Sequence, residues 1–114
     1  MNSPTSRQES LHYVWGAACD GWRLLNGEDL SVIEERVPPG AAECRHCHRL
    51  ARQFFYVLEG EATMEIEGRE HRLTRHQGIA VDPGQRHQFM NRSAADVVFL
   101  VISSPTTQGD RHDD

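Results

Sequence analysis

The sequence contains no apolar run that approaches the length of a membrane span. A transmembrane helix needs about 20 predominantly apolar residues, and a signal peptide needs a hydrophobic segment that residues 1–10 lack. The net charge is −5, and the basic residues are scattered rather than interleaved with aromatic residues in a stripe. This distribution argues against nucleic acid and acidic lipid surfaces as main partners. We therefore expect a soluble, unexported, cytoplasmic protein.

Cysteines are also few: Cys19, Cys44 and Cys47. Their number is odd, and a disulfide framework is not expected in a reducing compartment. We expect all three to be free thiols that are buried or half-buried.

Helical periodicity is missing as well, because no segment longer than about six residues repeats apolar positions every 3.6 residues. Instead, glycine and proline separate short apolar or alternating runs at intervals of about 8 to 12 residues, which is typical of an all-β barrel or sandwich of jelly-roll type. We predict strands over residues 12–15, 22–25, 30–37, 53–58, 62–67, 69–73, 79–81, 86–91 and 96–103.

The chain of 114 residues is the size of one domain with one hydrophobic core. Both ends of the chain are polar and show no periodicity. We predict a flexible arm over residues 1–10, a single β-barrel domain over residues 11–104 and a flexible tail over residues 105–114.

The stretch over residues 40–60 contains the residues around which we expect the rest of the chain to be organised. His46 and His48 lie two apart in a segment that reads as a strand, so both imidazoles project from the same face. His87 follows a tight turn in a second block. Imidazoles from two strands that converge inside a small β-structure are suited to bind a divalent metal ion. The alternative is that each histidine is a hydrogen-bonded residue of the core or its rim.

The segment from Cys44 to His48 also fits the C-x-x-C-H pattern of covalent haem attachment. On a strand, Cys44 and Cys47 would point to opposite faces, so they are poorly placed to hold one macrocycle. A thioredoxin-like redox pair is disfavoured too, because nothing in the sequence resembles the βαβ setting that it needs. We therefore favour a histidine metal site over both.

Two blocks over roughly residues 30–103 resemble the paired motifs of the cupin superfamily. The first motif has a glycine, a His-x-His pair, a glutamate and a closing glycine. Four positions match in register: Gly40, His46, His48 and Gly60. At the position of the glutamate this sequence has Gln53.

The second family motif has an opening glycine, a Pro-x-Gly turn, a histidine and an asparagine. Gly84, His87 and Asn91 match it, whereas Asp82 stands at the usual proline and His76 at the opening glycine. The resemblance implies an all-β, RmlC-like cupin fold, that is, a small jelly roll or double-stranded β-barrel. Cupins include dioxygenases, isomerases, epimerases and binding and storage proteins, so the resemblance does not decide the function.

Carried over to this sequence, the family pattern implies that His46, His48, Gln53 and His87 bind a divalent transition metal: Zn, Fe, Ni or Cu. Gln53 is neutral and its amide oxygen is a weaker donor than a carboxylate. The ion would therefore keep its charge of +2 and attract an anionic substrate such as an enolate or a carboxylate. The alternative role for Gln53 is a hydrogen bond that orients one of the histidines.

Strand alternation predicts the walls of the pocket. Phe55 and Val57 share the face of Gln53, and Phe89 shares the face of His87, so we expect these three residues to line it. Gln53 cannot act as a general base because an amide does not take up a proton near pH 7. The sequence assigns no carboxylate to that role.

Three functions remain open. The first is a metal-dependent, dioxygenase-like enzyme that polarises a ketone or enolate oxygen of a small organic substrate. The second is an isomerase-type cupin that acts on a sugar or sugar phosphate, because residues 48–60 are similar to the metal-bearing segment of type II mannose-6-phosphate isomerases, although no phosphate-binding loop or basic cluster is evident. The third is a non-catalytic module that binds a small ligand. We also expect a homodimer that uses edges or faces of residues 30–37 and 97–102.

Overall fold

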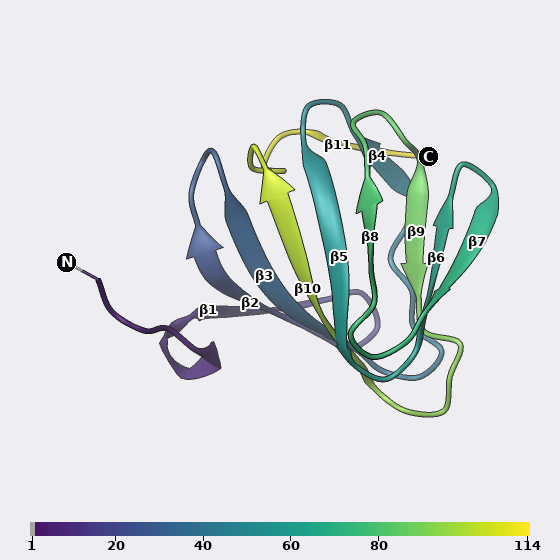
Figure 1. Cartoon of the computed structure of the whole chain (residues 1–114), viewed down its shortest axis with the longest axis horizontal. Helices are drawn as coiled ribbons and strands as arrows, with labels where there is room; N and C mark the ends of the chain where they lie inside the picture. The colour runs from purple at the N-terminus through teal and green to yellow at the C-terminus, as the bar shows by residue number, and fades with distance from the viewer. Residues whose placement is uncertain (1) are drawn as a thin grey trace.

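The regular structure consists of two antiparallel β-sheets and one short 3₁₀ helix, in a computed structural model that describes residues 2–114 (Figure 1). One sheet has six strands in the order β1-β2-β3-β10-β5-β8, and the other has five in the order β11-β4-β9-β6-β7. A 3₁₀ helix, η1 (Arg7–Glu9), precedes the first strand. The strands are β1 (Leu11–Trp15), β2 (Cys19–Asn26), β3 (Ser31–Val37), β4 (His46–His48), β5 (Arg52–Glu59), β6 (Ala62–Ile66), β7 (Arg69–Leu73), β8 (Gly78–Val81), β9 (His87–Met90), β10 (Val97–Ser104) and β11 (Arg111–Asp113).

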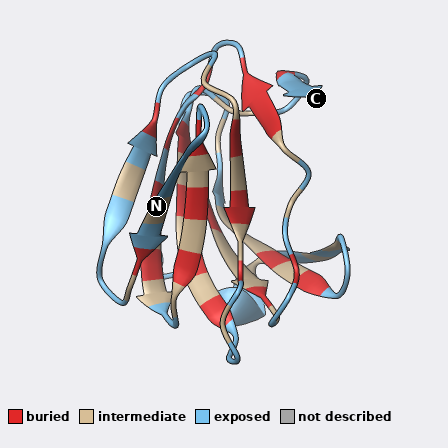
Figure 2. Cartoon of the chain, turned by 90° about the vertical axis from the view of Figure 1, so that its right-hand side faces the viewer, coloured by how far each residue is buried: buried red, intermediate tan, exposed pale blue. Residues whose placement is uncertain are grey.

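The hydrophobic core lies between the sheets because buried and less buried residues alternate along the strands (Figure 2). In β10, every second residue from Val97 to Ser103 is buried. Phe55 and Phe99 from the six-stranded sheet stack on Phe89 from the other sheet, with ring centroids 5.9 and 3.9 Å away. Burying a large apolar side chain stabilises a fold by about 1.5–3 kcal/mol, so these rings hold the two sheets together.

The all-β fold expected from the sequence is confirmed. Each strand predicted from the pattern of apolar residues overlaps a strand of the structure, and the histidine pair lies on a strand of its own, β4. Only β11 was not predicted.

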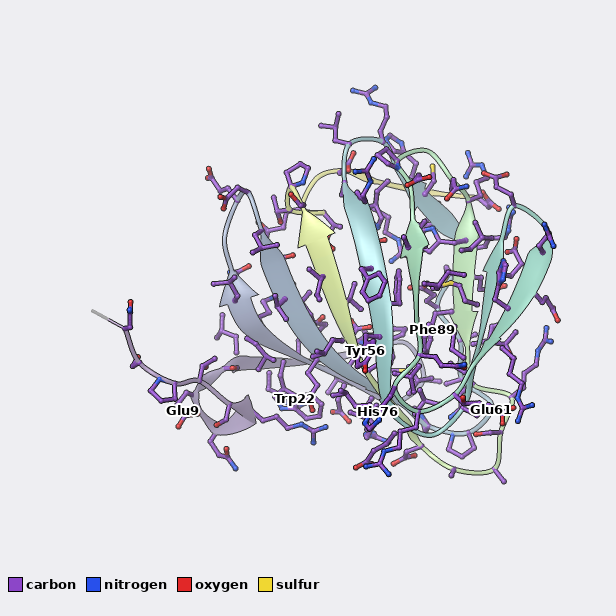
Figure 3. All side chains as sticks on the ribbon, viewed as in Figure 1. Glu9, Trp22, Tyr56, Glu61, His76 and Phe89 are labelled. Atoms are coloured by element: carbon purple, nitrogen blue, oxygen red, sulfur yellow. The ribbon has the colours of Figure 1, made fainter. Side chains whose placement is uncertain are left out.

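Two tight turns of the family motifs have backbone in the left-handed region. Gly60 follows β5 with a φ of 86°, and a Cβ there would lie 2.4 Å from the carbonyl oxygen of Asp96, so only glycine fits. His76 stands where the family has glycine, and it also has a positive φ, 65°. Histidine tolerates this region better than most residues, and its ring stacks on Tyr56 at an interplanar angle of 9° (Figure 3). The second motif thus keeps its turn without the glycine.

The C-terminal residues 105–114, expected to be a flexible tail, contain β11, which pairs with β4. Asp110 is buried, and its carboxylate accepts hydrogen bonds of 2.9 to 3.2 Å from the backbone N–H groups of Arg49, Leu50 and Ala51. Burial alone would raise the pKa of Asp110, but these bonds hold it below its ordinary value. The segment is fastened by partners about 60 positions earlier in the chain, which its own polar sequence does not reveal.

Of the edges and faces of residues 30–37 and 97–102 that we expect to pair with a second copy, the edges of β3 and β10 are not free. Both strands are paired on two sides within the six-stranded sheet, whose edges are β1 and β8. Leu11 and Val14 on β1 are 71% and 64% exposed, which is high for large apolar side chains. Before β1, the guanidinium of Arg7 lies 3.8 Å from the ring centroid of Trp22 and pairs with Glu34 at 2.5 Å.

Among residues 2–114, no helix has the length and the apolar character that a membrane span requires.

Candidate metal centre

Three histidines meet at one point because β4 and β9 are neighbouring strands. His46 on β4 pairs in register with His87, the first residue of β9, and His48 lies two residues further along the same face of β4. Their candidate ligand atoms all lie within 4.8 Å of one another. The exposed fractions are 3% for His46, 6% for His48 and 0% for His87. We call these three side chains, which the sequence singled out, the imidazole cluster.

Hydrogen bonds orient two of the rings. His46 Nδ1 lies 2.7 Å from the carbonyl oxygen of Cys44, and His87 Nδ1 lies 3.0 Å from that of Gln85. A carbonyl oxygen only accepts, so each Nδ1–H donates and each Nε2 keeps its lone pair. Within the described chain, His87 Nε2 and His48 Nδ1 are buried without a hydrogen-bond partner. Metal-binding histidines are commonly oriented by backbone carbonyls in this way.

Gln53, on β5, contributes a second buried acceptor without a partner, beside His87 Nε2. Its side-chain nitrogen donates to Ser103 Oγ at 3.2 Å, and no group of residues 2–114 donates to its Oε1. A buried polar atom left unpaired costs about 1–3 kcal/mol. The unpaired acceptors on His87 and Gln53 therefore favour an occupant that takes lone pairs. A divalent transition metal fits them, because imidazole nitrogens and amide oxygens are among its ordinary ligands.

Burial keeps the imidazole cluster uncharged. It lowers the pKa of His46 and of His48 from 6.5 to about 4, and it lowers the pKa of His87 in the same direction. The positive charge of Arg111 adds to this effect on all three rings. Neutral imidazole is the form that binds a metal, so the cluster need not lose protons at pH 7.

His46, His48 and Gln53 line a cavity of about 420 Å³ inside the barrel. Sites for small molecules usually measure about 300–1,000 Å³. Phe55 lines this cavity, whereas Val57 and Phe89 lie in the hydrophobic core, 0% and 1% exposed, and do not line it. Strand alternation predicts the face that a side chain occupies, but it does not predict whether neighbours cover that part of the face.

The cavity contains a carboxyl group that the sequence did not assign. Glu43 lies just before β4, and β9 holds it, because the Glu43 N–H donates to the Phe89 carbonyl at 3.1 Å and the Phe89 N–H donates to Glu43 Oε1 at 3.0 Å. The other oxygen, Oε2, lies 4.0 Å from His46 Nε2. Burial and, second, the nearby Glu35 raise the pKa of Glu43 from 4.5 to about 8.

Glu35, on β3, is the second acid of the cavity, and we call it and Glu43 the acid pair. The hydroxyl of Tyr13 donates to Glu35 Oε2 at 3.0 Å, and the guanidinium of Arg23 lies 4.8 Å from the ring centroid of Tyr13. Burial raises the pKa of Glu35 to about 7, against the opposing effects of Tyr13 and Arg23. It also raises the pKa of Tyr13 above its ordinary value.

A signal in the sequence could have found one member of the acid pair. Ile33, Glu35 and Val37 alternate along β3, and the two apolar neighbours are buried, so the same parity places Glu35 on the inner face. Glu43 gives no such signal, because residues 43–45 lie outside regular strand, where parity does not apply.

Strand β11 brings one more charged side chain to the cavity. Arg111 lines it, donating from Nη2 to the carbonyl oxygen of Cys44 at 3.3 Å and from Nε to Asp113 Oδ1 at 2.6 Å. Its charge lowers the pKa values of the acid pair as well as those of the imidazole cluster. The sequence placed this segment in a flexible tail, so Arg111 was not among the predicted site residues.

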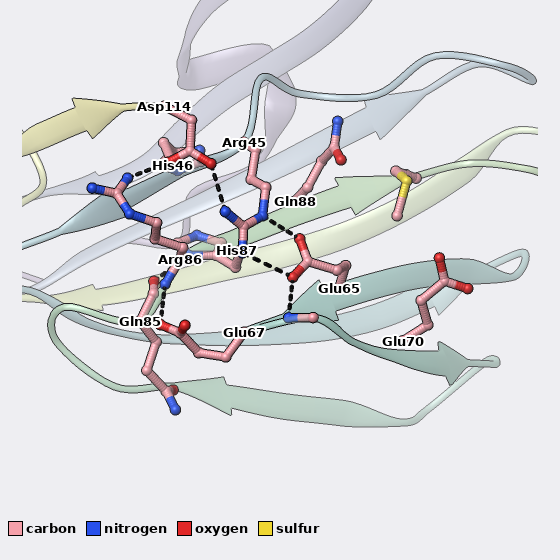
Figure 4. Close-up of polar contacts among 12 residues, drawn as sticks. Arg45, His46, Glu65, Glu67, Glu70, Gln85, Arg86, His87, Gln88 and Asp114 are labelled. Carbon is pink, nitrogen blue, oxygen red and sulfur yellow. Dashed lines mark hydrogen bonds and ion pairs between the residues drawn. The ribbon is translucent and has the colours of Figure 1, made fainter.

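Ion pairs fasten the C-terminal residue beside the imidazole cluster (Figure 4). Arg45 pairs with Glu65 at 2.7 Å and with Asp114 at 2.5 Å, and Arg86 also pairs with Asp114. Each of these arginines directly precedes a histidine of the cluster. The network therefore joins the two segments that carry the histidines to the end of the chain.

All three cysteines are free, as expected. Cys19 and Cys47 are buried, but Cys44 is exposed, because it lies in the irregular segment before β4. Cys44 lies outside β4, so the parity argument against haem attachment, which requires both cysteines to lie on a strand, does not apply to it.

The comparisons with known proteins agree with the fold. The sequence model of the family described as "Cupin domain" matches residues 33–103. The tetracenomycin polyketide synthase protein TcmJ of Streptomyces glaucescens is 35% identical over 65 residues, which cover 55% of this chain and 44% of TcmJ. The chain spans less than half the length of the curated relatives it matches.

Two solved structures have the same fold. The polyketide cyclase RemF from Streptomyces resistomycificus superposes with a TM-score of 0.85 at 18% identity, over 99% of this chain and 85% of RemF. A sugar phosphate isomerase of the cupin superfamily from Silicibacter pomeroyi superposes with a TM-score of 0.80 at 24% identity, over 91% of this chain and 76% of that protein.

Proposed function

The chain belongs to the cupin domain family, and from that premise we propose that it is a metal-dependent enzyme that rearranges a small organic molecule by proton transfer inside the barrel. The observation that carries the proposal is the buried imidazole cluster, with acceptor atoms that have no partner within residues 2–114, beside a cavity that also holds the acid pair.

The residues that would hold the ion are His46, His48 and His87, with the side-chain oxygen of Gln53. All four donors are neutral, so the set suits Zn, Fe, Ni or Cu. When bound, a divalent ion supplies a Lewis acid that polarises a carbonyl or enolate oxygen. The cavity of about 420 Å³ has room for a small organic molecule beside the histidines.

Glu35 and Tyr13 would move the proton. A general acid–base group works best when its pKa lies near the operating pH, and the pKa of Glu35 is raised to about 7. The Tyr13 hydroxyl, 3.0 Å from Glu35 Oε2, fixes the orientation of the carboxyl group. Phe55 and Trp15 provide apolar wall. These groups are suited to take a proton from a carbon next to a carbonyl and to return it elsewhere on the same molecule.

The names of the related structures favour this reaction class. One is a polyketide cyclase and one is a sugar phosphate isomerase. Cyclisation and isomerisation both rearrange a substrate without net oxidation. Both can proceed by proton transfer, which a carboxyl group in the cavity can perform. The dioxygenase-like reaction is the second candidate, favoured by a set of neutral donors that leaves coordination positions for O₂ or water.

The first test is metal content. Tag-free protein should contain close to one transition metal ion per chain by elemental analysis, and H87A should contain less than a tenth of that. Retention of the metal by H87A with unchanged affinity would overturn the proposed site.

The second test separates the reaction classes. Metal-loaded protein is incubated in D₂O with dihydroxyacetone, with fructose 6-phosphate and with an aromatic β-diketone, while NMR follows deuterium entry next to the carbonyl and an electrode follows O₂. The proposal expects exchange without O₂ uptake, and at least a tenfold loss in E35Q. O₂ uptake would establish the second candidate instead, and a bound metal with neither signal would leave a ligand-binding module.

The homodimer stays a prediction. The exposed apolar side chains of edge strand β1, Leu11 and Val14, support it, because an unpaired apolar edge is a ready surface for a second copy.

A further inference from the structure

The proposed ligand set lacks a negative charge. Position 53, where the family motif has glutamate, has glutamine, and the other proposed ligands are imidazoles, which bind a metal in their neutral form. An ion held by these four donors alone would keep its full +2 charge inside a buried site. Desolvating an uncompensated charge is costly, so a carboxylate near the cluster would stabilise binding.

Glu43 is placed to supply it. Backbone contacts with β9 fix its position from both sides, because the Glu43 N–H donates to Phe89 O and Gln88 Nε2 donates to the Glu43 carbonyl at 3.0 Å. One carboxyl oxygen accepts from the Phe89 N–H, so the other, Oε2, is directed towards His46 Nε2, 4.0 Å away. The Glu43 side chain is 13% exposed.

Within the described residues, no arginine forms an ion pair with Glu43 or Glu35. Arg45 pairs instead with Glu65 and Asp114, and Arg111 pairs with Asp113. Two acids thus share a cavity without a paired cation. Beside them lie acceptors with no partner on His87, which is fully buried, and on Gln53, which is 6% exposed.

We propose that Glu43 is a ligand of the metal and supplies the carboxylate that position 53 lacks. This inference rests on the proposed function. Two donors that each bind one ion at about 2.1 Å lie at most about 4.2 Å apart, and the Glu43 Oε2 to His46 Nε2 distance of 4.0 Å falls within that limit. Glu35 reaches the same cavity but carries the Tyr13 hydrogen bond, so it is the matched control.

The test uses Co²⁺ as the probe, titrated into metal-free full-length protein and followed by calorimetry and by its visible absorption spectrum. E43Q keeps the size of the side chain and an oxygen to accept from the Phe89 N–H. It should bind Co²⁺ at least about tenfold more weakly than the wild type, with an altered spectrum because one ligand has changed. E35Q should stay within threefold of the wild type with the same spectrum. Adding Q53E to E43Q should restore most of the affinity.

A shortened variant covers the case in which E43Q folds poorly. E43D keeps the charge but withdraws the oxygen by one methylene, so a ligand role predicts weak binding close to that of E43Q. E43D that binds like the wild type would show that only charge matters and would overturn ligation, as would E43Q with wild-type affinity and spectrum. The two proposals fail separately: if H87A loses Co²⁺ while E43Q does not, only the role of Glu43 is lost.

Discussion

The imidazole cluster and the acid pair share one cavity but respond to burial in opposite directions. Burial lowers the pKa of His46 and His48 to about 4, and it raises the pKa of Glu35 and Glu43 to about 7 and about 8. Each group is shifted towards its uncharged form. In the absence of a cation, the cavity therefore favours neutral histidines and protonated glutamic acids.

The largest predicted effect is on the pH dependence of stability in chelator-treated protein. The histidines have pKa values below the ordinary 6.5, so the unfolded chain binds more protons and the unfolding free energy falls as the pH drops from 6.5 towards 4. The acid pair has pKa values above the ordinary 4.5, so the folded chain binds more protons. The acid pair therefore adds to the unfolding free energy fully below pH 4.5, and this contribution is lost as the pH rises towards 8.

Between pH 6.5 and 8 only the acid pair acts, so the metal-free protein should be most stable near pH 6.5 and lose roughly 5 °C or more in Tm by pH 8. Scanning calorimetry at constant ionic strength measures this. E43Q should remove much of the loss above pH 6.5 and steepen the fall in Tm between pH 6.5 and 4.5, where the Glu43 carboxyl opposes the effect of the histidines. A Tm that rises steadily from pH 6.5 to 8 would contradict the comparison.

The second largest effect is predicted for loss of the Asp110 anchor, because it holds β11, the strand that carries Arg111. The charge of Arg111 acts on both the imidazole cluster and the acid pair. D110A removes the acceptor of three backbone N–H groups and should destabilise the packing of β11 by about 2–3 kcal/mol. Hydrogen exchange at residues 111–113 should rise sharply, while exchange in the core strand β10 changes little. Because Arg111 lowers pKa values in both groups, its release should raise them, so the folded chain binds more protons and the stability maximum should move to lower pH.

D113A is the matched control for D110A. Asp113 is exposed and pairs with Arg111 without holding the backbone of another segment. It should leave hydrogen exchange in β11 nearly unchanged. Equal exchange in the two variants would show that Asp110 does not anchor the segment.

The smallest effect is predicted for H76G, which restores the glycine of the family motif. Glycine relieves the strain of the left-handed backbone, which should stabilise the fold by about 1 kcal/mol. It also gives the unfolded chain more conformational freedom, which should destabilise the fold by about 0.4–1 kcal/mol, and it removes the stacking on Tyr56. Tm should change by only a few degrees in either direction, and Co²⁺ affinity should stay at the wild-type value. A large change in affinity would mean that this turn positions the cavity.

The sequence alone predicted the parts of the molecule that depend on local periodicity. Alternation of apolar residues located the strands, and a spacing of two residues placed His46 and His48 on one face of β4. The same rule applied to β3 would have added Glu35, between the buried Ile33 and Val37. His87 is grouped with them because it follows a tight turn on a second strand, and the family motifs give the same three histidines.

The missed residues depend on contacts between distant segments. Glu43 lies in irregular backbone, and its direction is set by hydrogen bonds with Phe89 on another strand. Residues 105–114 are polar, which locally indicates disorder, but the carboxylate of Asp110 finds three backbone N–H groups on residues 49–51. No pattern within either segment specifies these partners.

The irregular backbone before β4 also gives this protein a natural labelling position. Cys44 is exposed at the lining of the cavity, whereas Cys19 and Cys47 are buried, so a thiol-reactive dye should attach at one place. The carbonyl group of Cys44 accepts from both His46 and Arg111, and a fluorophore there would sit on the residue that links them. Its emission would report occupancy of the cavity in real time, with no knowledge of the natural substrate required.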